Sequence, residues 1–230
     1  MTAGRRKGGS LPGPQRSQPT HQPLMASFPA IAVVALALKG LLDGAASQAD
    51  GINPRTNILR ADQLKSVPES DGVSIFLYRL GFNTNRRHLP PRLAPDGTRF
   101  RASTPVDAHF LFTAWAKDPV SQLSLLGWVV RTLQDTPVLP PGFLNSFAGG
   151  RGEVFAASEG VELVGEVLSL QDFFNIWEVA QSPHQPSVSY VARMILIDSD
   201  VALADGGLVQ TRAFDLATII RDDPHPAPAP

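Results

Sequence analysis

The sequence contains no cysteine, and that absence excludes several kinds of chemistry at once. Disulfide frameworks, thiolate zinc sites and cysteine nucleophiles all require the missing side chain. The absence also agrees with a reducing cytoplasm, where disulfides are rare.

An excess of charge of one sign is also missing. The chain carries 20 Lys and Arg against 21 Asp and Glu, a formal net charge of −1. Such a balance produces no long-range field that would attract nucleic acid, so we expect no nucleic-acid partner. Arginines do gather locally at Arg86, Arg87, Arg92, Arg99 and Arg101. Because this stretch is rich in Pro and Gly, a solvated loop is favoured over a binding patch.

The motifs of common catalytic and metal sites are not found. There is no GxSxG elbow, no P-loop lysine and no HExxH pair, and no two histidines stand three or four residues apart. The five histidines are His21, His88, His109, His184 and His225. Only His109, inside a strand pattern, is expected to be ordered, as a packed or interface residue. We therefore predict no catalytic, cofactor-binding or metal-ligating residues, no cofactor and no enzymatic activity.

Two further features could suggest ligand binding. Trp115, Trp128 and Trp177 could form a platform for a sugar or a base, but all three lie within apolar segments, which favours core or subunit packing. The Gly-rich run at 149–152 matches neither GxGxxG nor a P-loop and follows no clear strand, which favours a flexible loop.

What remains is the composition of one globular domain with tails. Of 230 residues, 43% are hydrophobic and 18% charged, and the 21 prolines gather at ends and joints. Residues 1–25 form a basic Pro/Gly-rich segment predicted to be disordered, and Met25 is a second possible start of translation. We expect a single domain over residues 26–220 and a disordered Pro/Ala tail over 221–230.

The apolar segment 28–42 has two interpretations. Ile31, Val34, Leu38, Leu41 and Leu42 recur at helical spacing and predict a core helix. Alternatively, the basic residues near position 6 and the small residues at 47–49 could mark a signal peptide. A membrane span is not expected, because the run is shorter than about 20 apolar residues.

The rest of the chain alternates between strand and helix patterns. Strands are predicted at 73–80, 107–116, 161–168 and 188–197, with a short edge element near 57–60. Asp118-Pro119 begins a helix that reaches Gln134, with Leu123, Leu126, Val130 and Leu133 as its apolar stripe. Ser169 begins a second helix that reaches Ala180. The segment 81–104 is predicted to be a long loop, and 211–220 to be a further strand or helix. This order predicts an α+β domain with a mainly antiparallel sheet flanked by helices.

Two blocks resemble one known family. The first block, residues 106–141, follows a strand–helix–Pro pattern, and the second, residues 167–198, follows a helix–strand pattern. The matching positions of the first are Phe110, Leu111, Thr113, Leu126, Gly127, Leu133, Asp135, Pro137 and Leu139. Those of the second are Ser169, Leu170, Trp177, Gln185, Pro186, Ser187, Val188 and Tyr190. Together with SIFLYRL at 74–80 and the helix at 31–42, these blocks resemble the cap (tail-terminator) proteins of extracellular contractile injection systems, such as the antifeeding prophage and related virulence cassettes. The resemblance lies in the N-terminal domain of that family, a domain of unknown function.

The resemblance covers residues 30–197 and departs from the family in the basic tail before Met25 and the Gly-rich run at 149–152. It implies a phage tail-terminator-like fold and a structural role. The implied partners are further copies of the chain, as a homohexameric ring, and the inner tube and sheath proteins, with no membrane. The implied location is a particle that assembles in the cytoplasm and can be released. The signal-peptide interpretation implies instead an exported periplasmic or secreted binding module.

Overall fold

The structure, a computed structural model, describes residues 28–49, 53–65, 70–86, 89–94 and 96–204. The tails predicted at 1–25 and 221–230 and the element predicted at 211–220 lie outside these residues, as do His21, His88, His225 and Arg87.

A six-stranded sheet runs through the molecule in the order β1-β2-β5-β8-β7-β6. Its strands are β1 (Arg55–Ile58), β2 (Gly72–Phe82), β5 (Thr104–Trp115), β6 (Val138–Leu139), β7 (Val161–Glu166) and β8 (Ser187–Ile197). Only the β1–β2 pair is parallel, and every other neighbouring pair is antiparallel. The predicted α+β class and mainly antiparallel sheet are confirmed.

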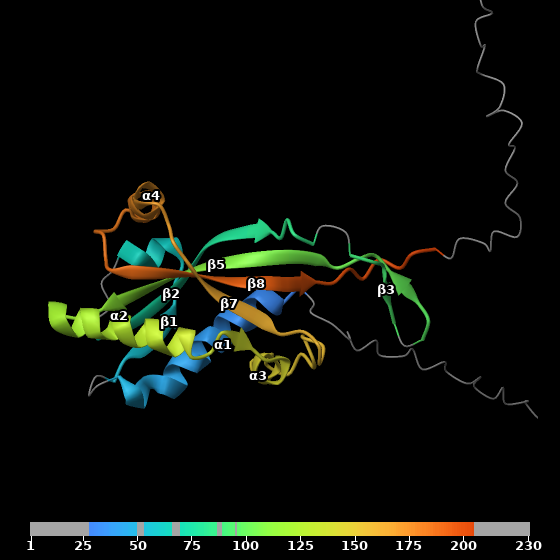
Figure 1. Cartoon of the computed structure of the whole chain (residues 1–230), viewed down its shortest axis with the longest axis horizontal. Helices are drawn as coiled ribbons and strands as arrows, with labels where there is room; N and C mark the ends of the chain where they lie inside the picture. The colour runs from blue at the N-terminus through green and yellow to red at the C-terminus, as the bar shows by residue number, and fades with distance from the viewer. Residues whose placement is uncertain (1–27, 50–52, 66–69, 87–88, 95, 205–230) are drawn as a thin grey trace, which may run out of the picture.

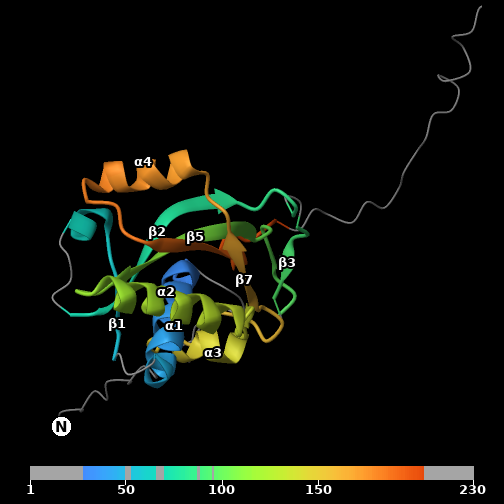
Figure 2. The same ribbon diagram turned by 60° about the vertical axis from the view of Figure 1, so that its left-hand side comes forward.

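Helices cover both faces of this sheet (Figures 1 and 2). On one face lie α1 (Ala30–Ala45), α2 (Pro119–Gln134) and α3 (Pro141–Ser146). On the other lies α4 (Leu170–Ala180), near the short 3₁₀ turn at Ala61–Lys65. A second short 3₁₀ turn, Ala46–Gln48, continues α1.

Strand β5 separates two hydrophobic cores, because successive side chains of a strand point to opposite faces. Phe110 and Phe112 are buried in the larger core, against α1 and α2. Leu111 and Trp115 are buried in the smaller core, which includes Trp177 of α4. Strict alternation along the strand thus holds from Phe110 to Trp115, and the strand's central position explains why both of its faces are apolar.

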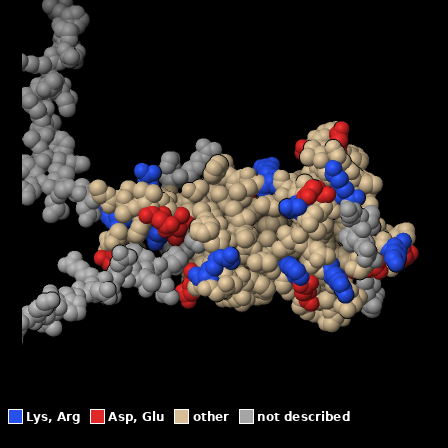
Figure 3. Space-filling view, turned by 180° about the vertical axis from the view of Figure 1, so that it is seen from behind, with Lys and Arg blue, Asp and Glu red and all other residues tan. Residues whose placement is uncertain are grey.

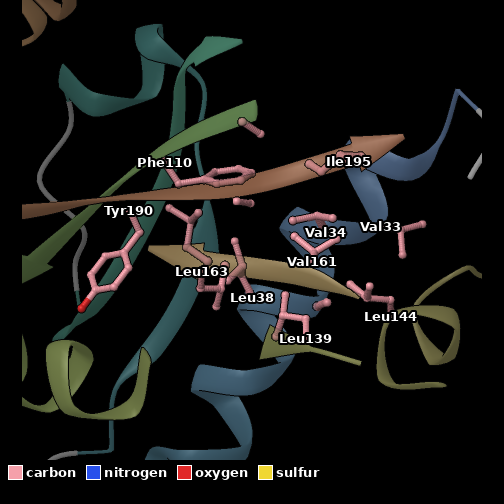
Figure 4. Close-up of a cluster of buried hydrophobic side chains, with 14 of the residues drawn as sticks. Val33, Val34, Leu38, Phe110, Leu139, Leu144, Val161, Leu163, Tyr190 and Ile195 are labelled. Atoms are coloured by element: carbon pink, nitrogen blue, oxygen red, sulfur yellow. The ribbon is translucent and has the colours of Figure 1, made fainter. Parts of the chain in front are cut away.

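The predicted N-terminal helix is confirmed as part of the larger core. Val34 and Leu38 have no exposed surface and pack near Val161 and Leu139 of the sheet (Figure 4). The helical run Ala30–Gln48 is the one described segment long and apolar enough to cross a membrane. One face of this helix is buried in the larger core. Cleavage after Ala49, as in the signal-peptide interpretation, would remove a core helix.

Helix α2 begins where predicted but buries a different stripe. The Asp118 carboxylate caps it, accepting a hydrogen bond from the Ser121 backbone N–H at 2.7 Å. The buried residues are Leu125, Val129 and Leu133, whereas Leu123 is 61% exposed. The predicted stripe is therefore wrong at Leu123, is only half-buried at Leu126 and Val130, and is right at Leu133. Two apolar stripes compete on this helix, and the packing against β5 and α1 selects one of them.

Strand β2 contains a bulge that the alternation pattern did not predict. Leu77 pairs with Phe110 and Arg79 with His109, so Tyr78 is an extra residue. Arg79 therefore shares the face of His109, and Leu80, paired with Ala108, shares the other face. Strict alternation along the strand would have placed Arg79 on the face of Val73 and Ile75, and the bulge moves it to the other face.

The long loop predicted at 81–104 contains two short strands. The segment 81–104 forms a hairpin of β3 (Arg92–Leu93) and β4 (Arg99–Phe100), at one end of the molecule (Figure 1). Helix α3 follows Pro140, the Gly-rich run at 149–152 forms a turn without helix or strand, and Val154 and Phe155 beyond it are buried. The edge strand predicted near 57–60 is present at Arg55–Ile58.

Candidate functional site

A cluster of polar side chains lies on the α4 side of the sheet, where β2, β5, β7 and β8 come together. At its centre is Glu166, the last residue of β7. The Glu166 carboxylate accepts hydrogen bonds from the Tyr78 hydroxyl and from Ser189 Oγ, the latter at 3.0 Å, and His109 Nδ1 lies 3.0 Å from the same oxygen. We call these four residues the Glu166 cluster.

Hydrogen bonding sets the protonation of this cluster. Burial by itself raises the pKa of Glu166, but the hydrogen bonds from His109, Tyr78 and Ser189, with the electrostatic attraction of His109, together outweigh burial and hold that pKa below its ordinary value of 4.5. Burial and the hydrogen bond to Glu166 raise the pKa of Tyr78 above its ordinary value of 10.0. Glu166 is therefore a carboxylate and Tyr78 a phenol at neutral pH.

The cluster contains the residue types of a serine hydrolase triad, but they are not hydrogen-bonded to one another in the way that a triad requires. In a nucleophilic triad the histidine stands between the serine and the acid and takes the serine proton. Here the serine and the histidine both contact the carboxylate. No group of three His, Asp or Glu in the described ranges could hold a metal ion. The arrangement joins strands and offers no activated nucleophile.

The histidine prediction is partly wrong. His109 is 7% exposed and packed, as expected. His184 is ordered as well, with its ring centroid 4.9 Å from that of Phe173 and 6.3 Å from that of Trp177. It lies in a Pro-rich connection with no pattern of its own, so local sequence gave no signal that α4 would contact it.

Helix α4 covers its face of the sheet incompletely. A cavity of about 600 Å³, lined partly by Glu166, Leu168 and Tyr190, opens beside it. A second cavity of about 410 Å³ lies between α4 and Phe76, Tyr78 and Arg79 of β2. The outer surface of α4 exposes Leu170 and Val179.

The β3–β4 hairpin is fastened to the chain that leaves β8. The Arg92 guanidinium lies 4.4 Å from the Phe100 ring centroid, and its Nε is 3.6 Å from an Asp198 carboxylate oxygen. The backbone adds hydrogen bonds from the Leu203 N–H to the Arg99 carbonyl, at 2.7 Å, and from the Arg101 N–H to the Val201 carbonyl, at 3.0 Å. The chain at 201–203 is thus held beside β4.

These contacts correct the prediction for the arginine-rich stretch. The Arg92 side chain is only 10% exposed, so at this position the stretch is a packed module. Arg99 and Arg101 are exposed, as predicted. On the face shown in Figure 3, Lys and Arg are interspersed with Asp and Glu and form no continuous basic surface.

The profile of the Pvc16 N-terminal domain matches residues 33–211, which is most of the chain. The chain belongs to this family. The match includes most of α1, the whole sheet and the β3–β4 hairpin. No curated protein sequence is similar enough to match.

Two solved structures are similar to this member of the Pvc16 N-terminal domain family. One is described as the sheath/tube terminator of PVC, an extracellular contractile injection system, in the extended state; it has a TM-score of 0.51 at 16% identity over 82% of this chain. The other is the tube-terminating cap of the anti-feeding prophage, with a TM-score of 0.46 at 15% identity over 79% of this chain. The chain spans 66% and 59% of those proteins' lengths. The first likeness confirms the tail-terminator fold.

Proposed function

We propose that this protein is a structural cap subunit, the tail terminator of a phage-tail-like contractile injection system. In this role six copies form a ring on the distal end of the inner tube and the sheath, where the ring ends tube growth and stabilises the sheath. The observation that carries the proposal is the family match over residues 33–211. The fold likeness to a sheath/tube terminator supports it.

The β3–β4 hairpin, at one end of the molecule, is our candidate for a contact between subunits or with the tube. Leu93 on the hairpin is 68% exposed, Phe82 at the end of β2 is 78% exposed, and Val201 beside β4 is 50% exposed. Exposed apolar side chains grouped at one end of a domain are typical of a surface that binds protein. We therefore propose that the segment 81–104 and the C-terminal segment from Asp198 onward lie at interfaces.

A cap of this kind needs rigid packing and complementary surfaces, and no bond has to be made or broken. The Glu166 cluster, which joins four strands without an activated nucleophile, fits that requirement. We propose that the protein is not an enzyme. We further propose that it assembles in the cytoplasm as part of a particle that is later released, and that its partners are its own copies, the tube protein and the sheath protein.

The decisive experiment is deletion of the gene in the producing cell, followed by electron microscopy of the particles. We expect tubes of irregular length and unstable sheaths, both restored by the intact gene. The purified protein should have the mass of a hexamer by light scattering. Particles of normal, uniform length without the protein would contradict the proposal.

A further inference from the structure

Strand β7 ends before its neighbour β8 does, and its end leaves a slot in the sheet. The last pair between the two strands joins Glu166 to Ser189, whereas β8 continues to pair with β5 through Val188 and Ser187. No described strand lies beside Ser187 and Val188 on the β7 side. The cavity of about 600 Å³ lies here, with both residues in its lining. We call this cavity the β7 slot, and its volume is in the range of roughly 300–1,000 Å³ that is typical of ligand sites.

The backbone of Ser187 presents its hydrogen-bonding groups to the β7 slot. In an antiparallel ladder, the N–H and C=O groups of successive residues point to alternate sides of the strand. The Pro186 carbonyl faces β5, where it accepts a hydrogen bond from the Ala114 N–H at 3.4 Å. The Ser187 N–H and C=O therefore face the slot, where no described backbone group bonds to them. A strand edge of this kind accepts an added extended segment.

The walls of the β7 slot are apolar on both faces of the sheet. Val130 of α2 lines one wall, and Leu170 and Phe173 of α4 line the other, since α2 and α4 cover opposite faces (Figure 2). Leu170 is 70% exposed, so the slot is open to solvent beside it. Such walls suit the aliphatic stem of a long side chain whose end is polar.

Glu166 places a negative charge in the β7 slot. Among the described residues that line the slot, it alone carries a charge. Its side chain is 23% exposed, and none of the ion pairs that the described Lys and Arg residues form involves it. An ionised carboxylate between apolar walls is complementary to a cation on an aliphatic stem.

The two oxygens of this carboxylate differ in their contacts, and the difference selects the cation. Oε2 accepts hydrogen bonds from the Tyr78 hydroxyl and from Ser189 Oγ and lies 3.0 Å from His109 Nδ1. Oε1 lies 3.1 Å from His109 Nδ1 and has no other hydrogen bond among the described residues. An arginine fork bonds both oxygens of a carboxylate, whereas a lysine ammonium needs only one. We propose that the β7 slot binds a lysine side chain carried on an extended segment of another protein.

The lysines of the chain itself do not suit the slot of a second copy. Lys39 and Lys65 bond to acceptors of their own chain. Lys117 lies in the bend directly before Asp118, which caps α2, and so is not on an extended segment. A second copy therefore offers no described lysine on a strand edge, and the proposed partner is a different protein.

Disulfide tethering tests the ligand chemistry, because the chain has no cysteine. The full chain with Leu170→Cys is equilibrated with thiols whose alkyl chains end in an ammonium, a guanidinium, a methyl or a carboxylate group. We expect capture of the ammonium thiol to be at least about tenfold stronger than that of the methyl thiol, because a charge-assisted hydrogen bond adds to the same apolar contacts. The guanidinium thiol should fall between them. Adding Glu166→Gln should remove the preference.

The matched control is Leu123→Cys, 61% exposed on α2 and outside the slot. There the ammonium and methyl thiols should be captured equally. This comparison between two cysteine positions does not need the Glu166→Gln variant. Equal capture of the two thiols at Leu170→Cys would overturn the proposal.

Fluorescence anisotropy with peptides blocked at both ends tests the extended segment. The peptide Thr-Val-Lys-Val-Thr should bind the native protein at least about tenfold more tightly than the same peptide with norleucine in place of lysine. Methylation of its backbone nitrogens should abolish binding, because strand addition needs the N–H groups. No binding of the lysine peptide, or equal binding of the methylated one, would overturn the proposal. So would tighter binding of a peptide of residues 1–12, because the chain itself would then supply the lysine, Lys7. Neither measurement depends on the cap function.

Discussion

Trp177 and Trp128 both lie in apolar helices, but the fold buries them unequally. Trp177 is 2% exposed and packs edge-on to Trp115, with ring centroids 6.4 Å apart. Trp128 is only half-buried, and its indole N–H donates to the Ala45 carbonyl at 3.3 Å. The two residues therefore stabilise the fold to different extents, although both lie in apolar segments of the sequence that predict the same degree of burial.

We predict that Trp177→Ala lowers the free energy of unfolding by about 3–5 kcal/mol, because it leaves a large cavity in the smaller core. Trp128→Ala should cost less. Chemical denaturation followed by circular dichroism measures both changes. The control is Val179→Ala, since Val179 is 78% exposed on the same helix as Trp177 and should change stability by less than about 0.5 kcal/mol. Equal losses in the two tryptophan variants would contradict the burial described here.

The hydrogen-bonded Glu166 carboxylate should make the free energy of unfolding fall at acid pH. Its pKa in the folded state lies below the ordinary 4.5, so the stabilisation from the carboxylate is complete above about pH 4.5 and is lost as the pH falls through the folded value. We expect Glu166→Gln to flatten the dependence of the free energy of unfolding on pH in that acid range. Urea unfolding at a series of pH values tests this.

Asp43→Asn is a suitable control for that experiment, because the Asp43 carboxylate pairs with Lys39 on an exposed helix surface. It should leave the acid limb nearly unchanged. An identical acid limb in the native protein and in Glu166→Gln would show that the Glu166 cluster does not hold the strands together as described.

At the scale of the elements, α1 and α3 meet at a glycine. A Cβ on Gly40 would overlap the ring of Phe147, which also packs against Phe143 with ring centroids 5.1 Å apart. A Cβ on Gly127 of α2 would have open space around it. The same substitution should therefore have opposite effects at the two helices.

We predict that Gly127→Ala raises the free energy of unfolding by about 0.5–1 kcal/mol, because alanine is the better helix former. Gly40→Ala should instead lower it by about 1 kcal/mol or more, because the Phe147 ring must leave its packing. Thermal and urea unfolding give both signs. An increase in stability for Gly40→Ala would mean that the ring yields freely.

The hairpin module depends on Arg92 at the same scale. Replacing its side chain in Arg92→Met removes the ion pair with Asp198 and the contact with Phe100. The amides of Arg101 and Leu203, which join the module to the C-terminal segment, should exchange about tenfold faster, while the global free energy of unfolding changes little. The control Arg60→Met removes an exposed ion pair and should not affect these amides. Unchanged exchange in Arg92→Met would show that the backbone bonds suffice.

For the whole molecule, we propose that subunits of the ring contact one another through the end of the domain that carries the β3–β4 hairpin. We predict that Leu93→Asp reduces hexamer formation at least about tenfold, because it places a charge in an apolar interface. Light scattering over a dilution series measures this. Val120→Asp is the matched control, since Val120 is 71% exposed at the start of α2. Equal assembly of both variants would place the subunit contact elsewhere.

Local sequence determined most of the elements, because their signals depend only on neighbouring residues. The caps at Asp118 and Ser169 fixed where α2 and α4 begin, and alternation in β5 fixed which side chains enter each core. The sequence blocks also carried the resemblance to the cap proteins, which the family match confirms.

Contacts between distant residues were decided only by the tertiary structure. The Glu166 cluster joins four strands, Arg92 meets Asp198 across 106 positions, and the bulge at Tyr78 exists only in its pairing with β5. The buried stripe of α2 was likewise chosen by its neighbours. None of these features has a local sequence signal, because each depends on the spatial order of the strands in the sheet and on the packing of the helices against it. That order also leaves one side of β8 without a described neighbour where β7 ends, which forms the β7 slot.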